Sequence, residues 1–285
     1  MKKQKEPRTV VYRDELNDEF SHAVIKPRRI DSRYRYLRRG PLFPVLRFIL
    51  YRLLAYPIGY VVFRLSLGFR FEGREKLKSV KGQGIFLFAN HTQEGADAFL
   101  PSYAVSPKGV YIVVHPSNVS QPLVGRLIPY LGALPLPSEH GAMRNFKEAI
   151  AARVKQGCCV TVYPEAHIWP YYTGIRPFLT TSFSFPVSLG APSFCMTVTY
   201  RRRRFRKKPR AVAVLDGPFY PDESLPVRRR AEELRDRIYR TMKERATLSD
   251  CEYIRYIPAS EEGTDALSDI PSERETACST AEERR

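Results

Sequence analysis

The chain has 285 residues and a formal net charge of +17, with 47 Lys and Arg against 30 Asp and Glu. This length can bury a sizeable core, and one large domain with extensions is the simplest organisation. The N-terminal Met-Lys-Lys is not followed by an apolar run, and the five cysteines show no metal-ligand spacing. We therefore expect no secretory signal peptide, no metal site, and reduced thiols in a cytosolic compartment.

The positive charge lies outside the C-terminal end of the chain. Residues 258–285 hold eight acidic and three basic residues, a net charge of −5, so residues 1–257 carry about +22. Such a field suits an anionic membrane or nucleic acid, although solubility alone also accounts for it. The densest basic run, Arg201–Lys208, should form a loop near the membrane. No nucleic-acid-binding motif accompanies it, so we expect no nucleic-acid partner.

The N-terminal quarter of the chain divides into two segments. Residues 1–40 are charged and rich in Tyr and Arg, which indicates a weakly ordered basic arm. Residues 41–68 are apolar, but the longest uncharged run, Leu53–Phe63, has only 11 residues, whereas a spanning helix needs about 20. Three arginines interrupt the segment: Arg47, Arg52 and Arg64. We expect a membrane-associating helical pair with guanidinium groups among the lipid phosphates; a helical hairpin covering the sheet is the alternative.

From residue 69 onward, strand-like and helix-like patterns alternate. The expected strands cover residues 84–89, 111–114, 158–163, 194–201 and 211–215, and the expected helices cover 96–104, 123–131, 142–156 and 225–244. This alternation predicts an α/β fold with a mostly parallel sheet covered by helices. We place this domain at residues 69–257 and expect a disordered acidic tail at 258–285.

Two of these strands end in polar side chains. The apolar run before Asn90-His91 is followed by Asp97, and the second run ends in Tyr-Pro-Glu165-Ala-His167. Adjacent strand ends in an α/β sheet usually open into one crevice. A neutral imidazole held by a carboxylate can take a proton from an alcohol near pH 7. A regular helix would separate His91 from Asp97, so a turn must fold the acid back; Glu94 is a nearer alternative.

These segments resemble the glycerolipid acyltransferase family, which includes the lysophosphatidic acid acyltransferases. That family carries Asn-His-x4-Asp and, further along the chain, Phe-Pro-Glu-Gly-Thr-Arg. The resemblance covers roughly residues 45–220 and includes Leu131-Gly132-Ala-Leu-Pro-Leu, which stands where the family has a Gly-containing glycerol-phosphate motif. This chain departs from the pattern in three ways. Its first spacing is His-x5-Asp, its second block lacks the family's Gly, Thr and Arg, and the family's phosphate-binding Arg falls at Ser138.

The resemblance implies an O-acyltransferase similar to the 1-acylglycerol-3-phosphate acyltransferases. Such an enzyme moves a fatty acyl group from acyl-CoA or acyl carrier protein to the hydroxyl of a lysophospholipid, in phospholipid biosynthesis. It needs no cofactor beyond this co-substrate and works at the cytoplasmic face of the membrane, as a peripheral or monotopic protein. The alternative is a non-catalytic membrane-binding protein that retains the fold, which the altered Pro-Glu-Ala-His block favours.

The resemblance also assigns candidate site residues. His91 would be the general base and Asp97 its orienting acid, while Glu165 would hold the acceptor or support the site. The expected substrate-binding residues are Gly132, Arg144, His167 and Arg176. Arg176 is the first choice to bind the acceptor's phosphate, because it lies between a Gly and a Pro that fix a turn. Arg144 and Lys147 are the alternatives. Trp169 and two nearby tyrosines would form an interfacial aromatic patch or a wall of the acyl pocket.

Overall fold

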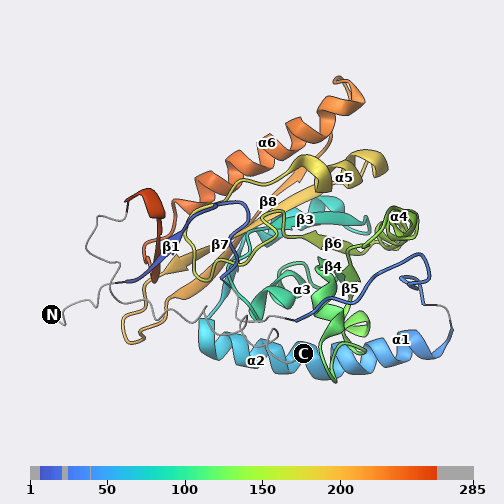
Figure 1. Cartoon of the computed structure of the whole chain (residues 1–285), viewed down its shortest axis with the longest axis horizontal. Helices are drawn as coiled ribbons and strands as arrows, with labels where there is room; N and C mark the ends of the chain where they lie inside the picture. The colour runs from blue at the N-terminus through green and yellow to red at the C-terminus, as the bar shows by residue number, and fades with distance from the viewer. Residues whose placement is uncertain (1–6, 21–24, 39, 262–285) are drawn as a thin grey trace, which may run out of the picture.

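The computed structural model describes residues 7–20, 25–38 and 40–261, and Figure 1 shows a central twisted sheet with helices on both faces. The strands are β1 (Arg8–Tyr12), β2 (Arg70–Glu72), β3 (Ile85–Ala89), β4 (Val110–Val114), β5 (Ala133–Pro135), β6 (Cys159–Val162), β7 (Ser193–Arg201), β8 (Arg210–Phe219) and β9 (Ile254–Pro258). The α-helices are α1 (Leu42–Arg47), α2 (Tyr56–Leu67), α3 (Leu100–Ala104), α4 (His140–Lys155), α5 (Ser184–Leu189) and α6 (Val227–Ala246). A π-helical segment, η1 (Phe48–Ala55), joins α1 to α2. Short 3-10 helices are η2 (Arg74–Val80), η3 (Ala96–Ala98), η4 (Pro116–Ser120), η5 (Ile128–Leu131), η6 (Thr180–Phe183) and η7 (Ala259–Glu261).

The main sheet confirms the predicted α/β fold. Its seven strands lie in the order β2-β8-β7-β3-β6-β4-β5. All neighbouring pairs are parallel except β7 and β8, which run antiparallel. Strands β3, β4, β5, β6 and β7 therefore point the same way, and the chain leaves β3, β6, β4 and β5 at one common edge of the sheet.

Strand β3 is buried on both faces, which is why its sequence is a continuous apolar run. Phe86 and Phe88 pack into the cluster formed with α4 and α6, whereas Ile85 and Leu87 pack into the cluster formed with α3. Phe88 also stacks on Phe183, with ring centroids 4.1 Å apart. Full burial of each such side chain contributes about 1.5–3 kcal/mol to stability. This packing fixes the strand that leads into the Asn-His motif.

The apolar N-terminal segment is one helix rather than the expected pair. Residues Leu42–Leu67 run without a break through α1, η1 and α2 along one side of the domain (Figure 1), and they are long and apolar enough to cross a membrane. Pro57 falls in the first turn of α2, just past the π-helical segment, so its missing N–H does not break the helix. Gly68, in the left-handed conformation, ends the helix.

The same helix exposes its apolar side chains, and of its three arginines Arg47 and Arg52 are partly buried whereas Arg64 is exposed. Arg47 donates hydrogen bonds to the carbonyls of Tyr130 and Val110, at 3.2 and 3.1 Å. The guanidinium of Arg52 stacks over a tyrosine ring, and Arg64 donates to a backbone carbonyl just beyond the helix. These contacts differ from the expected placement of the guanidinium groups among lipid phosphates. The outward side chains at least 40% exposed are Leu42, Val45, Leu46, Phe48, Ile49, Leu53, Leu54, Ile58, Tyr60, Val61, Val62 and Leu65.

The segment expected to be a weakly ordered arm is held against the domain by aromatic packing. Strand β1 pairs in parallel with β9, which brings the two ends of the described chain together. Between them lies Trp169, which is fully buried, stacks on Tyr256 at 4.9 Å, and also contacts Tyr12 and Phe20. Trp169 is therefore a core residue and not part of an exposed aromatic patch. The expected disordered tail falls largely on residues 262–285, outside the described part of the chain.

Candidate active site

His91 lies at the carboxyl end of β3, and its neighbour Asn90 fixes the strand at that point. The side-chain amide of Asn90 donates to the carbonyl of Val198 at 3.0 Å, and its oxygen accepts the amide N–H of Val198 at 2.7 Å. Asn90 is 1% exposed, so it extends the strand pairing from inside the core. Its geometry explains why an amide stands immediately before the histidine.

The structure pairs His91 with Asp97 rather than Glu94. The distance from His91 Nδ1 to Asp97 Oδ2 is 2.7 Å, and the same oxygen accepts the backbone N–H of Gln93 at 2.9 Å. The chain turns back through η3, as the spacing required. Asp97 is 2% exposed, whereas Glu94 is exposed to solvent. The extra residue in His-x5-Asp is thus accommodated without loss of the pair.

The environment of Asp97 favours one tautomer of the imidazole. Burial raises the pKa of the Asp97 carboxyl, and the hydrogen bonds from His91 and Gln93 act in the opposite direction. Because the carboxyl oxygen faces Nδ1, the proton is held at Nδ1 and Nε2 is left as the basic nitrogen. The His91 side chain is 18% exposed, so a small molecule can reach it.

Tyr163 supports the same pair and is a residue that the sequence analysis did not single out. Its ring stacks on His91, with centroids 4.4 Å apart and an interplanar angle of 24°. Its hydroxyl donates to the backbone carbonyl of Asp97 at 2.6 Å. The available signal was the residue before the Pro-Glu pair, because the resembled family has Phe there and a Phe cannot make this hydrogen bond.

Glu165 binds backbone amides with both carboxylate oxygens. Oε2 accepts the N–H of His91 at 3.0 Å, and Oε1 accepts the N–H of Arg176 at 3.1 Å. Burial raises the pKa of Glu165, and the nearby Arg176 guanidinium and the two N–H groups act against that rise. This geometry joins the loop after β6 to the catalytic strand end, and it matches a supporting role better than a direct grip on substrate.

The structure places Arg176, the first choice to bind the acceptor's phosphate, inside the protein. The residue is fully buried. Its guanidinium donates to the carbonyls of Glu165 at 3.1 Å, Glu15 at 3.2 Å and His167, and it lies 4.8 Å from the ring centre of Trp169. A buried guanidinium with these partners has no face for a phosphate. The turn between the Gly and the Pro does fix Arg176, but it directs the side chain into the protein interior.

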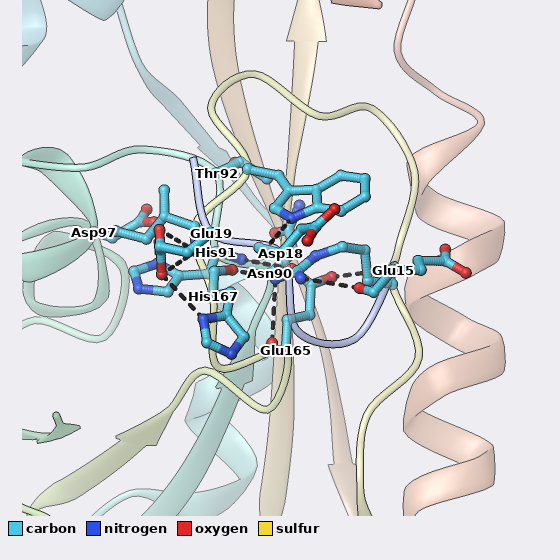
Figure 2. Close-up of polar contacts among 12 residues, drawn as sticks. Glu15, Asp18, Glu19, Asn90, His91, Thr92, Asp97, Glu165 and His167 are labelled. Atoms are coloured by element: carbon cyan, nitrogen blue, oxygen red, sulfur yellow. Dashed lines mark hydrogen bonds and ion pairs between the residues drawn. The ribbon is translucent and has the colours of Figure 1, made fainter. Parts of the chain in front are cut away.

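The remaining candidates are spread over the domain. His167 lies near Glu165, and its Nδ1 is 3.2 Å from a carboxylate oxygen of Glu19, so the N-terminal segment lies beside the site (Figure 2). Gly132 precedes β5 and lies at the opposite edge of the sheet. There its φ of +103° and a backbone carbonyl 2.5 Å from any added Cβ explain why a glycine occupies this turn. The Arg144 side chain is 85% exposed on α4 and faces Glu148 at 3.8 Å.

Comparisons with known proteins give a family match and a similar solved structure. A model of the acyltransferase family matches residues 68–199. No curated protein sequence matches the chain. Among solved structures, the chain is similar to the 1-acyl-sn-glycerophosphate acyltransferase PlsC from Thermotoga maritima, with 17% identity and a TM-score of 0.49 over 74% of this chain and 84% of that one. The family match spans β3, β6 and the loops that carry His91, Asp97 and Glu165. Residues 68–199 therefore match the acyltransferase family, in agreement with the resemblance of the chain's motifs to the glycerolipid acyltransferases.

Proposed function

We propose that this protein transfers a fatty acyl group from a thioester, acyl-CoA or acyl carrier protein, to the hydroxyl of a lysophospholipid such as 1-acyl-sn-glycerol 3-phosphate. The observation that carries the proposal is the 2.7 Å contact between His91 and Asp97 at the open edge of the sheet. The contact orients an imidazole that can act as a base, and the family match supports the reaction class.

The proposed reaction needs only one proton carrier. Nε2 of His91 takes the proton from the acceptor hydroxyl as its oxygen attacks the thioester carbonyl. Collapse of the tetrahedral intermediate breaks the carbon–sulfur bond, and the imidazolium returns the proton to the departing thiolate. Backbone N–H groups of the crevice stabilise the oxyanion. Because a thiolate leaves readily, the mechanism requires no covalent enzyme intermediate.

The reaction would take place at a membrane surface. Helix Leu42–Leu67 is exposed along its apolar side, while Tyr51, Gly59 and Leu67 bury the other side in the domain. A helix packed lengthwise on the domain suits a monotopic position better than a crossing one. The basic hairpin between β7 and β8 lies close to the end of this helix, where Arg203 donates to the carbonyl of Ser66. Anionic lipid would attract that hairpin.

The activity is tested with a panel of lysophospholipids, each offered with acyl-CoA and with acyl carrier protein, and the products are identified by mass spectrometry. The expected result is one preferred acceptor that gains one acyl chain, with no product from the His91→Ala variant. A wild-type protein that binds vesicles but forms no product with any combination would support the non-catalytic alternative.

The membrane position is tested by vesicle flotation of a Leu53→Gln/Ile58→Gln variant. Both side chains are exposed, so the fold should be unchanged, and the fraction bound to anionic vesicles should fall and depend on salt. The control is Leu179→Gln/Val227→Gln, which removes two equally exposed apolar side chains elsewhere. Equal binding by both variants would contradict the proposal. Point variants are preferable to deletion of residues 1–68, because that deletion also removes Glu15 and Glu19 from the site.

A further inference from the structure

A groove of about 750 Å³ lies between the N-terminal segment and the loop that follows η4. Its cationic walls are formed by Lys26 and Arg28 on one side and Arg126 on the other. A second hollow of about 480 Å³ shares Pro27 and Arg28 with the first, so the two form one continuous surface feature. These volumes fall in the range of sites for small molecules.

The backbone of the N-terminal wall is held in place while its basic side chains stay available. The amide of Arg28 donates to the Ser120 hydroxyl at 2.8 Å. The amide of Ile30 donates to the Ser138 hydroxyl at 3.0 Å, and the Ser138 amide returns a hydrogen bond to the Ile30 carbonyl at 2.9 Å. Ile30 itself is fully buried. Among the described residues, no carboxylate forms an ion pair with Lys26, Arg28 or Arg126.

The groove opens on the same edge of the sheet as His91. Its second hollow is lined by His115, which follows β4, and by Leu136–Ser138, which follow β5. Strand β4 is two strands away from β3 in the sheet, which at the usual strand spacing is roughly 10 Å. One extended substrate can therefore reach from the base to these cations.

The groove also adjoins the exposed apolar surface of the protein. Leu123, which lines it, is 96% exposed with a φ of +64°. The loop continues into η5, where Tyr130 packs against Phe43 of the helix Leu42–Leu67 with ring centroids 5.1 Å apart. Arg28 lies over the ring of Tyr34, 5.4 Å from its centre, and therefore keeps its positive charge without a carboxylate partner. Three cations without a carboxylate partner among the described residues, beside an apolar surface, are the arrangement that would receive an anionic group attached to an acyl chain or to a long flexible arm.

We propose that this groove binds a phosphate group carried by one of the two substrates, with Arg28 and Arg126 as its main contacts; the inference rests on the proposed acyltransferase function. The shared chemistry is a phosphate, which arginine grips through paired hydrogen bonds. The phosphate belongs either to the headgroup of the acceptor lipid or to the coenzyme A part of the donor. In the first case the N-terminal segment supplies the cation that the chain lacks at Ser138.

The test compares substrates that differ only in phosphate. The Arg28→Gln/Arg126→Gln variant is assayed with 1-acylglycerol 3-phosphate against 1-acylglycerol as acceptor, and with acyl-CoA against the matching N-acetylcysteamine thioester as donor. The value of kcat/KM should fall at least about tenfold with the phosphate-bearing member of one pair and stay nearly unchanged with the phosphate-free member. The matched control is Arg228→Gln/Arg229→Gln, which removes the same charge from α6.

Each outcome has one meaning. A loss confined to the phosphate-bearing acceptor assigns the groove to the lipid headgroup, and a loss confined to acyl-CoA assigns it to the coenzyme. An equal loss with all four substrates, the same loss in the control, or no loss would overturn the proposal. If the wild type transfers no acyl group at all, the proposed function fails, and calorimetry with coenzyme A and a short-chain lysophosphatidic acid then tests the groove by itself. Binding of neither compound, or equal binding by wild type and variant, would overturn it.

Discussion

Two buried carboxylates stand at neighbouring strand ends of this sheet, and they have different partners. Asp97, after β3, directs one oxygen at the imidazole of His91. Glu165, after β6, gives one oxygen to each of two backbone N–H groups, those of His91 and Arg176. A carboxylate that faces a side chain can tune its proton affinity, whereas one that faces backbone amides fixes where two loops meet. The two carboxylates are similarly buried, but Asp97 orients the His91 side chain, whereas Glu165 holds two backbone segments together.

The largest effect should come from removing the base that Asp97 orients. His91→Ala should lower turnover by about 10²- to 10⁴-fold, the usual contribution of general-base catalysis. The protein should still fold, with a lower melting temperature because the buried Asp97 loses its imidazole partner. Turnover measured at saturating donor and acceptor, together with thermal unfolding, checks this. Turnover equal to that of the wild type would rule out the mechanism.

A smaller loss should follow from changing the orienting acid. Asp97→Asn keeps the shape but presents an amide to Nδ1, which permits the wrong tautomer, so turnover should fall by about tenfold to a hundredfold. Glu94→Gln is the matched control, because Glu94 is a nearby exposed carboxylate. If the Glu94 variant were the slower enzyme, Asp97 would not be the orienting acid.

Glu165→Gln should lower the stability of the protein more than Asp97→Asn does. The substituted amide group would face a backbone N–H, and Arg176 would lose its buried counter-charge. The free energy of unfolding should drop by about 1–3 kcal/mol, whereas Asp97→Asn should affect activity more than stability. Denaturant titration of both variants measures this difference. A Glu165→Gln protein as stable as the wild type would show that Glu165 is not needed to hold the two backbone segments together.

Tyr163→Phe should lower turnover only modestly, because it removes only the hydroxyl that donates to the Asp97 carbonyl. One lost hydrogen bond of about 1 kcal/mol corresponds to a few-fold loss of turnover. The pH–rate profile should shift if the imidazole is less firmly held, which a purely structural role would not produce. An unchanged rate and profile would show that ring stacking alone positions His91.

Changing Asp216 should have the smallest effect, on stability, and that effect should depend on pH because the partners of Asp216 are cations. Burial acts to raise its pKa, but hydrogen bonds from Arg245 and Lys76 outweigh burial and hold the pKa below the usual aspartate value. Its contribution to stability is therefore present above about pH 4 and is lost as the pH falls through its folded pKa. The loss of melting temperature in Asp216→Asn should be largest at neutral pH and shrink in acid. A pH-independent loss would contradict this sign.

The sequence predicted the central strands of the sheet and the edge that carries the candidate site because those signals are local. The apolar run before His91 and the Pro before Glu165 are short patterns, and the five expected strands, α4 and α6 formed near their expected bounds, whereas the three-residue strands β2 and β5 were not predicted. The burial of Arg176 is not local, because it depends on Glu15, 161 positions earlier. The single helix Leu42–Leu67 was missed for a similar reason. Its arginines interrupt the pattern in sequence, but in the fold Arg47 contacts the distant carbonyls of Tyr130 and Val110 and the ring of Tyr111.

The inward turn of Arg47 links lipid binding to folding. Arg47 leaves the apolar side of the helix only while the domain supplies the carbonyls of Val110 and Tyr130 as acceptors. In the unfolded chain the same guanidinium group is free to face any direction, and the segment loses its continuous apolar side. A ligand that binds only the folded state raises its stability by mass action. A bilayer on this side would therefore act as a ligand of the native state, and the melting temperature should rise with lipid concentration even without substrate.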